Sequence, residues 1–135
     1  MVHAQNFSTA SAYLFTSNSA LSLGWSNIDN ALYYTNVAYF YNTYYYLTSA
    51  YHNAYTAISY AYAGYISNTT ALNYNSFYYS YLNSYYVYYA ALYAYYSYTQ
   101  GPTYVLSLIA YIDLADDANG SAAYYCGLSS VGGTR

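Results

Sequence analysis

The sequence predicts an all-α protein in which a long antiparallel helical hairpin is joined to shorter helices at both ends. Two observations lead to this fold class. Apolar and aromatic residues recur at alternating steps of three and four through the middle of the chain, which is the spacing of one helix face. Small residues form stripes at the same spacing, with turn signals between the patterned segments. A β-rich polymer is the alternative, because tyrosine also favours strands.

The first helix is expected over 8–24, a segment rich in Ser and Ala. Leu14, Leu21 and Ile28 recur every seven residues, which is a heptad spacing. The opening residues have neither the positive start nor the apolar run of a signal peptide.

A long helix is expected over 27–67. Ser26 is a suitable N-cap, and Asp29 three residues later is an acidic variant of the capping box. The helix then continues as a heptad seam, which is typical of packed helices. The seam consists of Val37, Phe40, Tyr44, Leu47, Tyr51, Ala54, Ile58, Ala61 and Tyr65.

A second long helix is expected over 70–98, after a turn at Asn68-Thr69-Thr70 in which Thr70 is the N-cap. Small residues along one line let two backbones approach closely, while the rings beside them interlock. Because a short turn joins the two helices, they are expected to form the antiparallel hairpin. The small stripe consists of Asn73, Ser76, Ser80, Asn83, Val87, Ala90, Ala94 and Ser97.

A short apolar helix is expected over 102–118. Gly101 suits the end of the preceding helix and Pro102 the first position of the next one. Asn119-Gly120 predicts the end of this helix, and the tail 121–135 has no evident period. The 135 residues suffice for a single structural domain. No apolar run reaches the roughly 20 residues of a membrane span, so no transmembrane insertion is expected.

The composition is dominated by tyrosine and is nearly free of charge. Tyrosine supplies 29 of 135 residues, and charged residues only 4%, where roughly a quarter is typical. Charge normally keeps folded monomers apart, so we expect a surface covered by copies of the same chain, by sugar, or by both. Nucleic acid is not an expected partner, because Arg135 is the only basic side chain other than the histidines.

Tyrosines on both long segments are expected to pack the assembly. A tyrosine ring supplies contact area, its hydroxyl still finds a hydrogen-bond partner, and ordering it costs little entropy. The residues assigned to this packing are Tyr44, Tyr51, Tyr65, Tyr79, Tyr86, Tyr89, Tyr93 and Tyr96.

No enzyme, cofactor or metal is expected. His3 and His52 have no carboxylate near them in sequence, and the aspartates at 113–117 do not match the spacing of a calcium loop. Cys126 is the single cysteine, so no disulfide can form within the chain. It is expected to be an inert packing residue, with an inter-subunit disulfide as the alternative.

Three sequons predict attachment of N-linked glycan. They begin at Asn6, Asn68 and Asn119. Asn68 and Asn119 fall in expected turns, where a glycan could be accommodated.

In composition and in the patterned segments over 27–98, the chain resembles filament and virion structural proteins of hyperthermophilic archaea. The resemblance implies a self-assembling structural subunit of an extracellular filament or a virion-associated filament or shell. It also implies an extracellular, cell-surface or virion-surface location. The basic cleavage site of archaeal type IV pilins and the basic residues of DNA-wrapping coat proteins are absent. The alternative function is a carbohydrate-binding or adhesive surface protein that uses tyrosine stacking.

Overall fold

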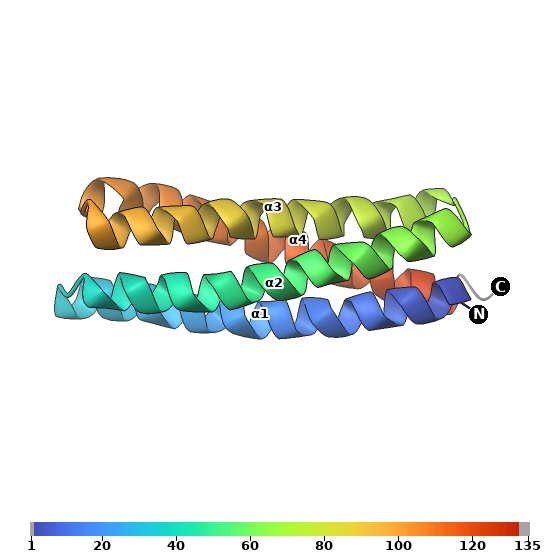
Figure 1. Cartoon of the computed structure of the whole chain (residues 1–135), viewed down its shortest axis with the longest axis horizontal. Coiled ribbons are helices and arrows are strands. Elements are labelled where there is room, and N and C mark those ends of the chain that lie inside the picture. The colour runs from blue at the N-terminus through green and yellow to red at the C-terminus, as the bar shows by residue number, and fades with distance from the viewer. Residues whose placement is uncertain (1, 133–135) are drawn as a thin grey trace.

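The computed structural model describes residues 2–132, which form four long helices (Figure 1). Helix makes up 94% of the structure, and no strand occurs within the described range. The protein is therefore all-α, as predicted, and the β-rich alternative is wrong. The elements are α1 (Val2–Tyr34), α2 (Ala38–Ser67), α3 (Ala71–Thr99), the 3-10 turn η1 (Pro102–Tyr104) and α4 (Val105–Gly132).

The helices form a bundle in which each helix runs antiparallel to the one before it (Figure 1). Both α1 and α3 pack against α2 and α4. The turn between α2 and α3 lies at the same end as the start of α1 and the end of α4. Helices of 28 to 33 residues give a rod about 45 Å long, at about 1.5 Å per residue.

The single helix expected over 27–67 is wrong, because the chain reverses at residues 35–37. Thr35 adopts a φ of 51°, in the left-handed region that residues other than glycine rarely occupy. The side-chain oxygen of Asn36 accepts a hydrogen bond of 3.0 Å from the backbone nitrogen of Ala38, which supports the first turn of α2. Neither Gly nor Pro marks this break, so the sequence pattern does not reveal it.

α1 is one continuous helix from Val2 to Tyr34, and it contains the segment 8–24. Ser26 is not an N-cap, because its hydroxyl donates to the carbonyl oxygen of Ser22 inside α1. The expected heptad positions Leu14, Leu21 and Ile28 are all buried, so that part of the prediction is confirmed.

α3 agrees with the helix expected over 70–98 to within one residue at each end. The Thr70 hydroxyl accepts a hydrogen bond of 3.1 Å from the backbone nitrogen of Asn73, which is the predicted N-cap interaction. Every residue of the small stripe from Asn73 to Ser97 is buried. Side-chain size therefore decides which face of this helix enters the core.

α4 extends well beyond the predicted end at residue 118. The chain enters it through Gly101, with a φ of 102°, and Pro102, as expected. It then remains helical through Asn119-Gly120 to Gly132. The predicted helix end at Asn119-Gly120 is therefore wrong, and the part of the predicted tail up to Gly132 is helical. Small residues at 119, 122, 126 and 129 are buried and form one helix face, whose low hydropathy hides it from a search for apolar residues. Residues 133–135 of the predicted tail lie outside the described range.

The core is built mainly from small residues and a few large aliphatic ones. Its two clusters centre on Leu21, Leu47 and Ile112 near one end and on Phe7 and Leu14 near the other. At Gly24 of α1, the absence of a side chain leaves space for Leu47 of α2. A Cβ on Gly24 would lie 3.2 Å from a methyl carbon of Leu47, closer than ordinary packing distance.

Buried polar side chains connect neighbouring helices and fix their relative height. A partnered buried hydrogen bond contributes about 1 kcal/mol to stability. The bonds are Ser17 Oγ to the Ala50 oxygen at 2.8 Å, Thr43 Oγ1 to the Gly24 oxygen at 3.2 Å, Asn119 Nδ2 to the Leu14 oxygen at 3.0 Å, and Ser76 Oγ with Ser129 Oγ at 2.7 Å.

Candidate functional site

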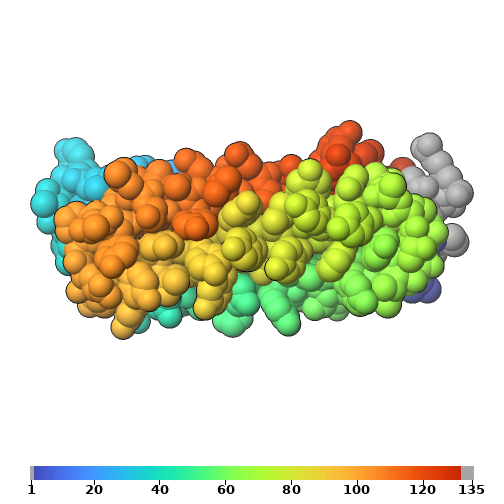
Figure 2. Space-filling model, turned by 90° about the horizontal axis from the view of Figure 1, so that it is seen from above, coloured from blue at the N-terminus to red at the C-terminus, as the bar shows by residue number. Residues whose placement is uncertain are grey.

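Tyrosine is concentrated on one half of the bundle. α2 has ten tyrosines and α3 twelve, out of 29 in the chain. None of the 29 is fully buried, because small residues occupy the core. Figure 2 looks onto α3, with α4 along one edge and α2 along the other, and the side chains of α3 cover most of this view. We call the surface formed by α2 and α3 the tyrosine face.

Within residues 2–132, the formal charges lie on the other half. Asp29 belongs to α1, and Asp113, Asp116 and Asp117 belong to α4. α2 and α3 contain no Asp, Glu, Lys or Arg. The bundle therefore has an uncharged tyrosine half and an acidic half, an asymmetry that arises only when the four helices are placed in space.

Aromatic rings pair across the seam between α2 and α3 as a ladder. Ring centroids lie 5.1 to 5.7 Å apart in its five pairs, within the range of favourable aromatic contacts. Each step along α2 is matched by an equal step back along α3, so the ladder keeps one antiparallel register. The pairs are Tyr41–Tyr98, Tyr44–Tyr95, Tyr51–Tyr88, Tyr62–Phe77 and Tyr65–Tyr74.

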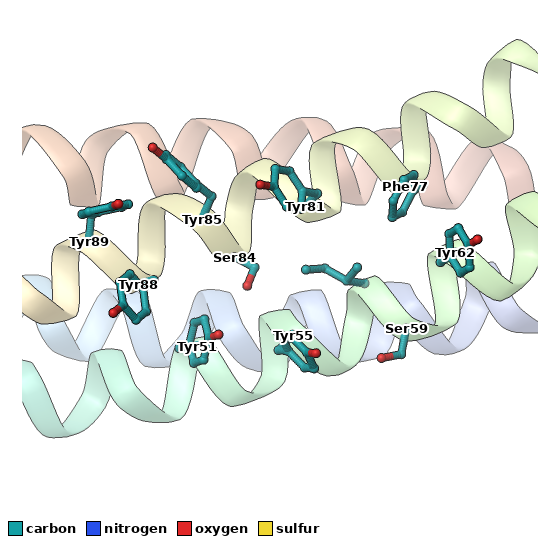
Figure 3. Close-up of a pocket in the computed structure, with 11 residues that line it drawn as sticks. Tyr51, Tyr55, Ser59, Tyr62, Phe77, Tyr81, Ser84, Tyr85, Tyr88 and Tyr89 are labelled. Atoms are coloured by element: carbon teal, nitrogen blue, oxygen red, sulfur yellow. The ribbon is translucent and has the colours of Figure 1, made fainter.

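The ladder is interrupted where one partner is small. The same register places Ser84 opposite Tyr55, and here a groove of about 550 Å³ opens between the helices. Figure 3 shows the Ser84 hydroxyl pointing from α3 toward α2, with Tyr51 and Tyr88 beyond it on one side and Tyr62 and Phe77 on the other. Seven of the lining residues are tyrosines. The groove can therefore receive a large side chain between rows of rings.

A second, smaller hollow repeats this relation further along the tyrosine face. Thr48 and Ala91 occupy the opposed positions there, and the hollow has a volume of about 300 Å³. Tyr51 and Tyr88 line both hollows and form the wall between them. The tyrosine face thus alternates ring pairs with depressions, a relief suited to interlocking with another surface of the same kind.

The phenols on this face influence one another's ionisation. The charge that Tyr85 would carry raises the pKa of Tyr89 above 10.0, and a hydrogen bond with Tyr85 acts in the same direction. Their ring centroids are 5.0 Å apart. The Tyr89 phenol therefore stays protonated at neutral pH.

The tyrosines assigned from sequence already pack between helices of one subunit. All eight are half-buried. Tyr44, Tyr51 and Tyr65 belong to the ladder between α2 and α3. The other five pack toward η1 and α4: Tyr79 on Tyr125, Tyr86 and Tyr89 on Tyr111, Tyr93 on Tyr104 and Tyr111, and Tyr96 on Tyr104.

The exposed tyrosines were missed by that assignment. On α3 they follow their own helical spacing, opposite the small stripe, and this spacing was readable in the sequence. They are Tyr74, Tyr78, Tyr81, Tyr85, Tyr88, Tyr95 and Tyr98. On α2 the exposed set is Tyr41, Tyr45, Tyr55, Tyr60 and Tyr62.

The three sequons lie in different surroundings. The expected exposed turn at Asn119 is wrong. Asn119 lies inside α4 and is 5% exposed, and its amide nitrogen donates to the carbonyl oxygen of Leu14. A glycan on the folded chain at this position would require that bond to break. Asn6, near the start of α1, and Asn68, in the turn between α2 and α3, are half-buried.

The single cysteine and the histidine at position 52 also have defined positions in the fold. Cys126 is buried in the core, which leaves no room for the inter-subunit disulfide. His52 is exposed beside Tyr51.

Within residues 2–132, no three His, Cys, Asp or Glu side chains are grouped so that they could hold a metal ion. In the same range, no helix is both long and apolar enough to cross a membrane.

The chain matches no protein-family model, no curated protein and no solved structure. Its function is therefore inferred from the geometry and chemistry of its own residues.

Proposed function

We propose that this protein is a structural subunit that assembles into an extracellular or virion-associated filament or shell, with copies packed through the tyrosine face. The observation that carries the proposal is the separation of 22 tyrosines on α2 and α3 from the four aspartates on α1 and α4. A face without charge can be covered by another copy without the cost of burying an ion.

The size of the tyrosine face suits a stable contact. Two helices about 45 Å long and about 10 Å apart present roughly 900 Å². A standard protein interface buries about 800 Å² on each partner. The face therefore suffices for one such contact.

The exposed rings supply the contact energy. Tyr45 is 64% exposed and Tyr55 58%, so much of each ring is available to a neighbour. Burying apolar area yields about 25 cal/mol per Å², and tyrosine loses little rotamer entropy when it is ordered. Its hydroxyl can bond to a neighbouring phenol or carbonyl, which avoids an unpaired buried polar group.

The acidic half sets the orientation of the copies. Aspartates on α1 and α4 repel the same surface of another copy, which favours contacts through the uncharged half. In this proposal Asn6 and Asn68 carry the N-linked glycan. Asn6 is near the start of α1 and Asn68 is in the turn between α2 and α3. These two segments lie at the same end of the bundle (Figure 1), so the sugar would project from one end of each subunit.

The test places a charge on each half. Tyr55→Asp on α2 and Tyr85→Asp on α3 add a carboxylate to the tyrosine face. Leu23→Asp is the matched control on α1, since Leu23 is 46% exposed and Tyr85 43%. Assembly is followed by sedimentation velocity and by electron microscopy of the natively assembled material.

We expect both tyrosine variants to remain small species, while Leu23→Asp assembles like the unaltered chain. Circular dichroism checks that each variant is still helical. A chain that stays monomeric at every concentration, or tyrosine-face variants that assemble normally, would contradict the proposal.

A further inference from the structure

A groove of about 570 Å³ lies between α1 and α4, on the acidic half of the bundle. This volume is within the usual range for small-ligand sites. Residues at helical spacing line both walls. They are Ser11, Phe15 and Asn18 from α1 and Asp116, Asn119, Gly120 and Ala123 from α4.

Asn119 places an oriented amide in the wall of this groove. Its side chain is 5% exposed, and its nitrogen donates to the carbonyl oxygen of Leu14 at 3.0 Å. That bond fixes the amide, and the amide oxygen is not among the buried side-chain atoms that lack a partner within residues 2–132. An amide oxygen has two lone pairs and can accept a hydrogen bond from a ligand hydroxyl that reaches it.

Packing does not explain Gly120. A glycine inside a helix costs about 1 kcal/mol relative to alanine. Gly24 and Gly64 meet neighbouring side chains within 3.2 Å of a Cβ position, whereas a Cβ on Gly120 would meet nothing within 4 Å. The glycine instead widens the groove that it lines.

Phe15 adds an apolar ring to the lining of the groove, and Asp116 adds a hydrogen-bond acceptor. The Phe15 ring is 74% exposed, and it offers an apolar face beside the polar groups. The Asp116 carboxylate accepts hydrogen bonds, while Ser11 and Asn18 can both donate and accept. The lining contains no cationic side chain, so an acidic ligand would be repelled.

We propose that the groove between α1 and α4 binds a neutral saccharide. Hydroxyl groups of the sugar donate to the carboxylate of Asp116 and the amide oxygen of Asn119, and one apolar sugar face packs on the ring of Phe15. The site lies on the opposite half from the tyrosine face, so it does not depend on the proposed assembly. This site differs from the tyrosine stacking that the alternative function predicted from the sequence would use.

Equilibrium dialysis against maltose, cellobiose and lactose at millimolar concentration tests this, because it measures bound sugar whether the protein is assembled or not. Gly120→Leu places a large side chain in the groove. Gly127→Leu is the matched control: a Cβ there also meets nothing within 4 Å, but the residue does not line the groove. Leucine is a strong helix former, so both variants are expected to keep the helical circular dichroism spectrum.

We expect at least one disaccharide to bind, Gly120→Leu to weaken it at least about tenfold, and Gly127→Leu to change it less than about twofold. Phe15→Ser should also weaken binding. The proposal is overturned if none of the three sugars binds the unaltered chain, or if Gly120→Leu and Gly127→Leu bind equally well. Loss of assembly in Tyr85→Asp with sugar binding intact would show that the two functions are separate.

Discussion

The Phe7 ring of α1 occupies the space that a side chain on Gly64 of α2 would need. A Cβ built on Gly64 would stand 2.7 Å from two carbon atoms of that ring, far inside van der Waals contact. Phe7 is itself completely buried, so the ring has nowhere to move. The glycine is therefore what allows α1 and α2 to close over this end of the core.

Gly64→Ala should lower the free energy of unfolding by about 1–3 kcal/mol, because overpacking a rigid core site outweighs the better helix propensity of alanine. Gly127→Ala is the control, since its Cβ meets nothing within 4 Å, and it should be neutral or stabilising by up to about 1 kcal/mol. Urea unfolding followed by circular dichroism measures both. Equal effects of the two substitutions would show that Phe7 does not constrain residue 64.

Two buried serines on α3 should respond oppositely to the same substitution. The Ser76 hydroxyl bonds to Ser129 at 2.7 Å, whereas the Ser97 hydroxyl has no partner within residues 2–132. Ser76→Ala should destabilise by about 1–2 kcal/mol, because it leaves the Ser129 hydroxyl unpaired, and Ser97→Ala should be neutral or stabilising. The midpoints of urea unfolding of the two variants, compared with the unaltered chain, measure both effects. A clear loss of stability in Ser97→Ala would mean that its hydroxyl has a partner, such as an internal water.

The N-cap of α3 should be worth about 1 kcal/mol. Thr70→Ala removes the acceptor for the backbone nitrogen of Asn73. Thr69→Ala is the control, because Thr69 is exposed in the same turn and does not cap the helix. Thermal unfolding should shift down for Thr70→Ala only, and a similar shift in both variants would assign the effect to the turn rather than to the cap.

Burial raises the pKa of the Cys126 thiol from 9.0 to about 11, outweighing its hydrogen bond with Ser80. The unfolded chain therefore loses this proton first, so the contribution of the thiol to stability is complete below about pH 9 and falls as pH rises toward 11. Comparison with Cys126→Ala at each pH separates this effect from tyrosine ionisation. The stability advantage of the unaltered chain should shrink across that interval, and a constant difference would contradict the buried assignment.

Assembly through the tyrosine face should be insensitive to salt and sensitive to strong alkali. No ion pair is available on α2 or α3 to be screened. Phenols ionise near pH 10, with Tyr89 delayed by its neighbour Tyr85, so assemblies should come apart above that pH. Light scattering across a salt series and a pH series checks both. Dissolution in salt at neutral pH would point to charged contacts instead.

Local signals were sufficient for some parts of the fold. The N-cap at Thr70, the buried stripe of α3 and the break at Gly101-Pro102 each depend on residues close together in sequence. The turn at Thr35 and the continuation of α4 through Asn119 were not predictable in this way. Thr35 pays a backbone strain that packing of α1 on α2 must offset, and Asn119 is held by a residue 105 positions away.

The sequence predicted which segments carry the candidate assembly surface, but not which of their tyrosines face outward. The tyrosine-rich segments were plain, yet the residues chosen from them, such as Tyr93, are held inside the subunit against Tyr111 and Tyr104. Which tyrosines face outward depends on which helix faces are covered by neighbours. The register between α2 and α3 also creates the groove at Ser84, and no single helix contains that information.

By itself, the sequence determined that the protein is helical, nearly uncharged and rich in tyrosine, because helix periodicity and composition are local properties of the chain. Only the tertiary structure decided that four helices of similar length pack as a bundle and that tyrosines and aspartates fall on opposite halves. It also decided that Asn119 is buried beside a groove rather than displayed in a turn. The physical reason is that burial depends on contacts between residues far apart in the chain, and those contacts exist only once the helices have packed.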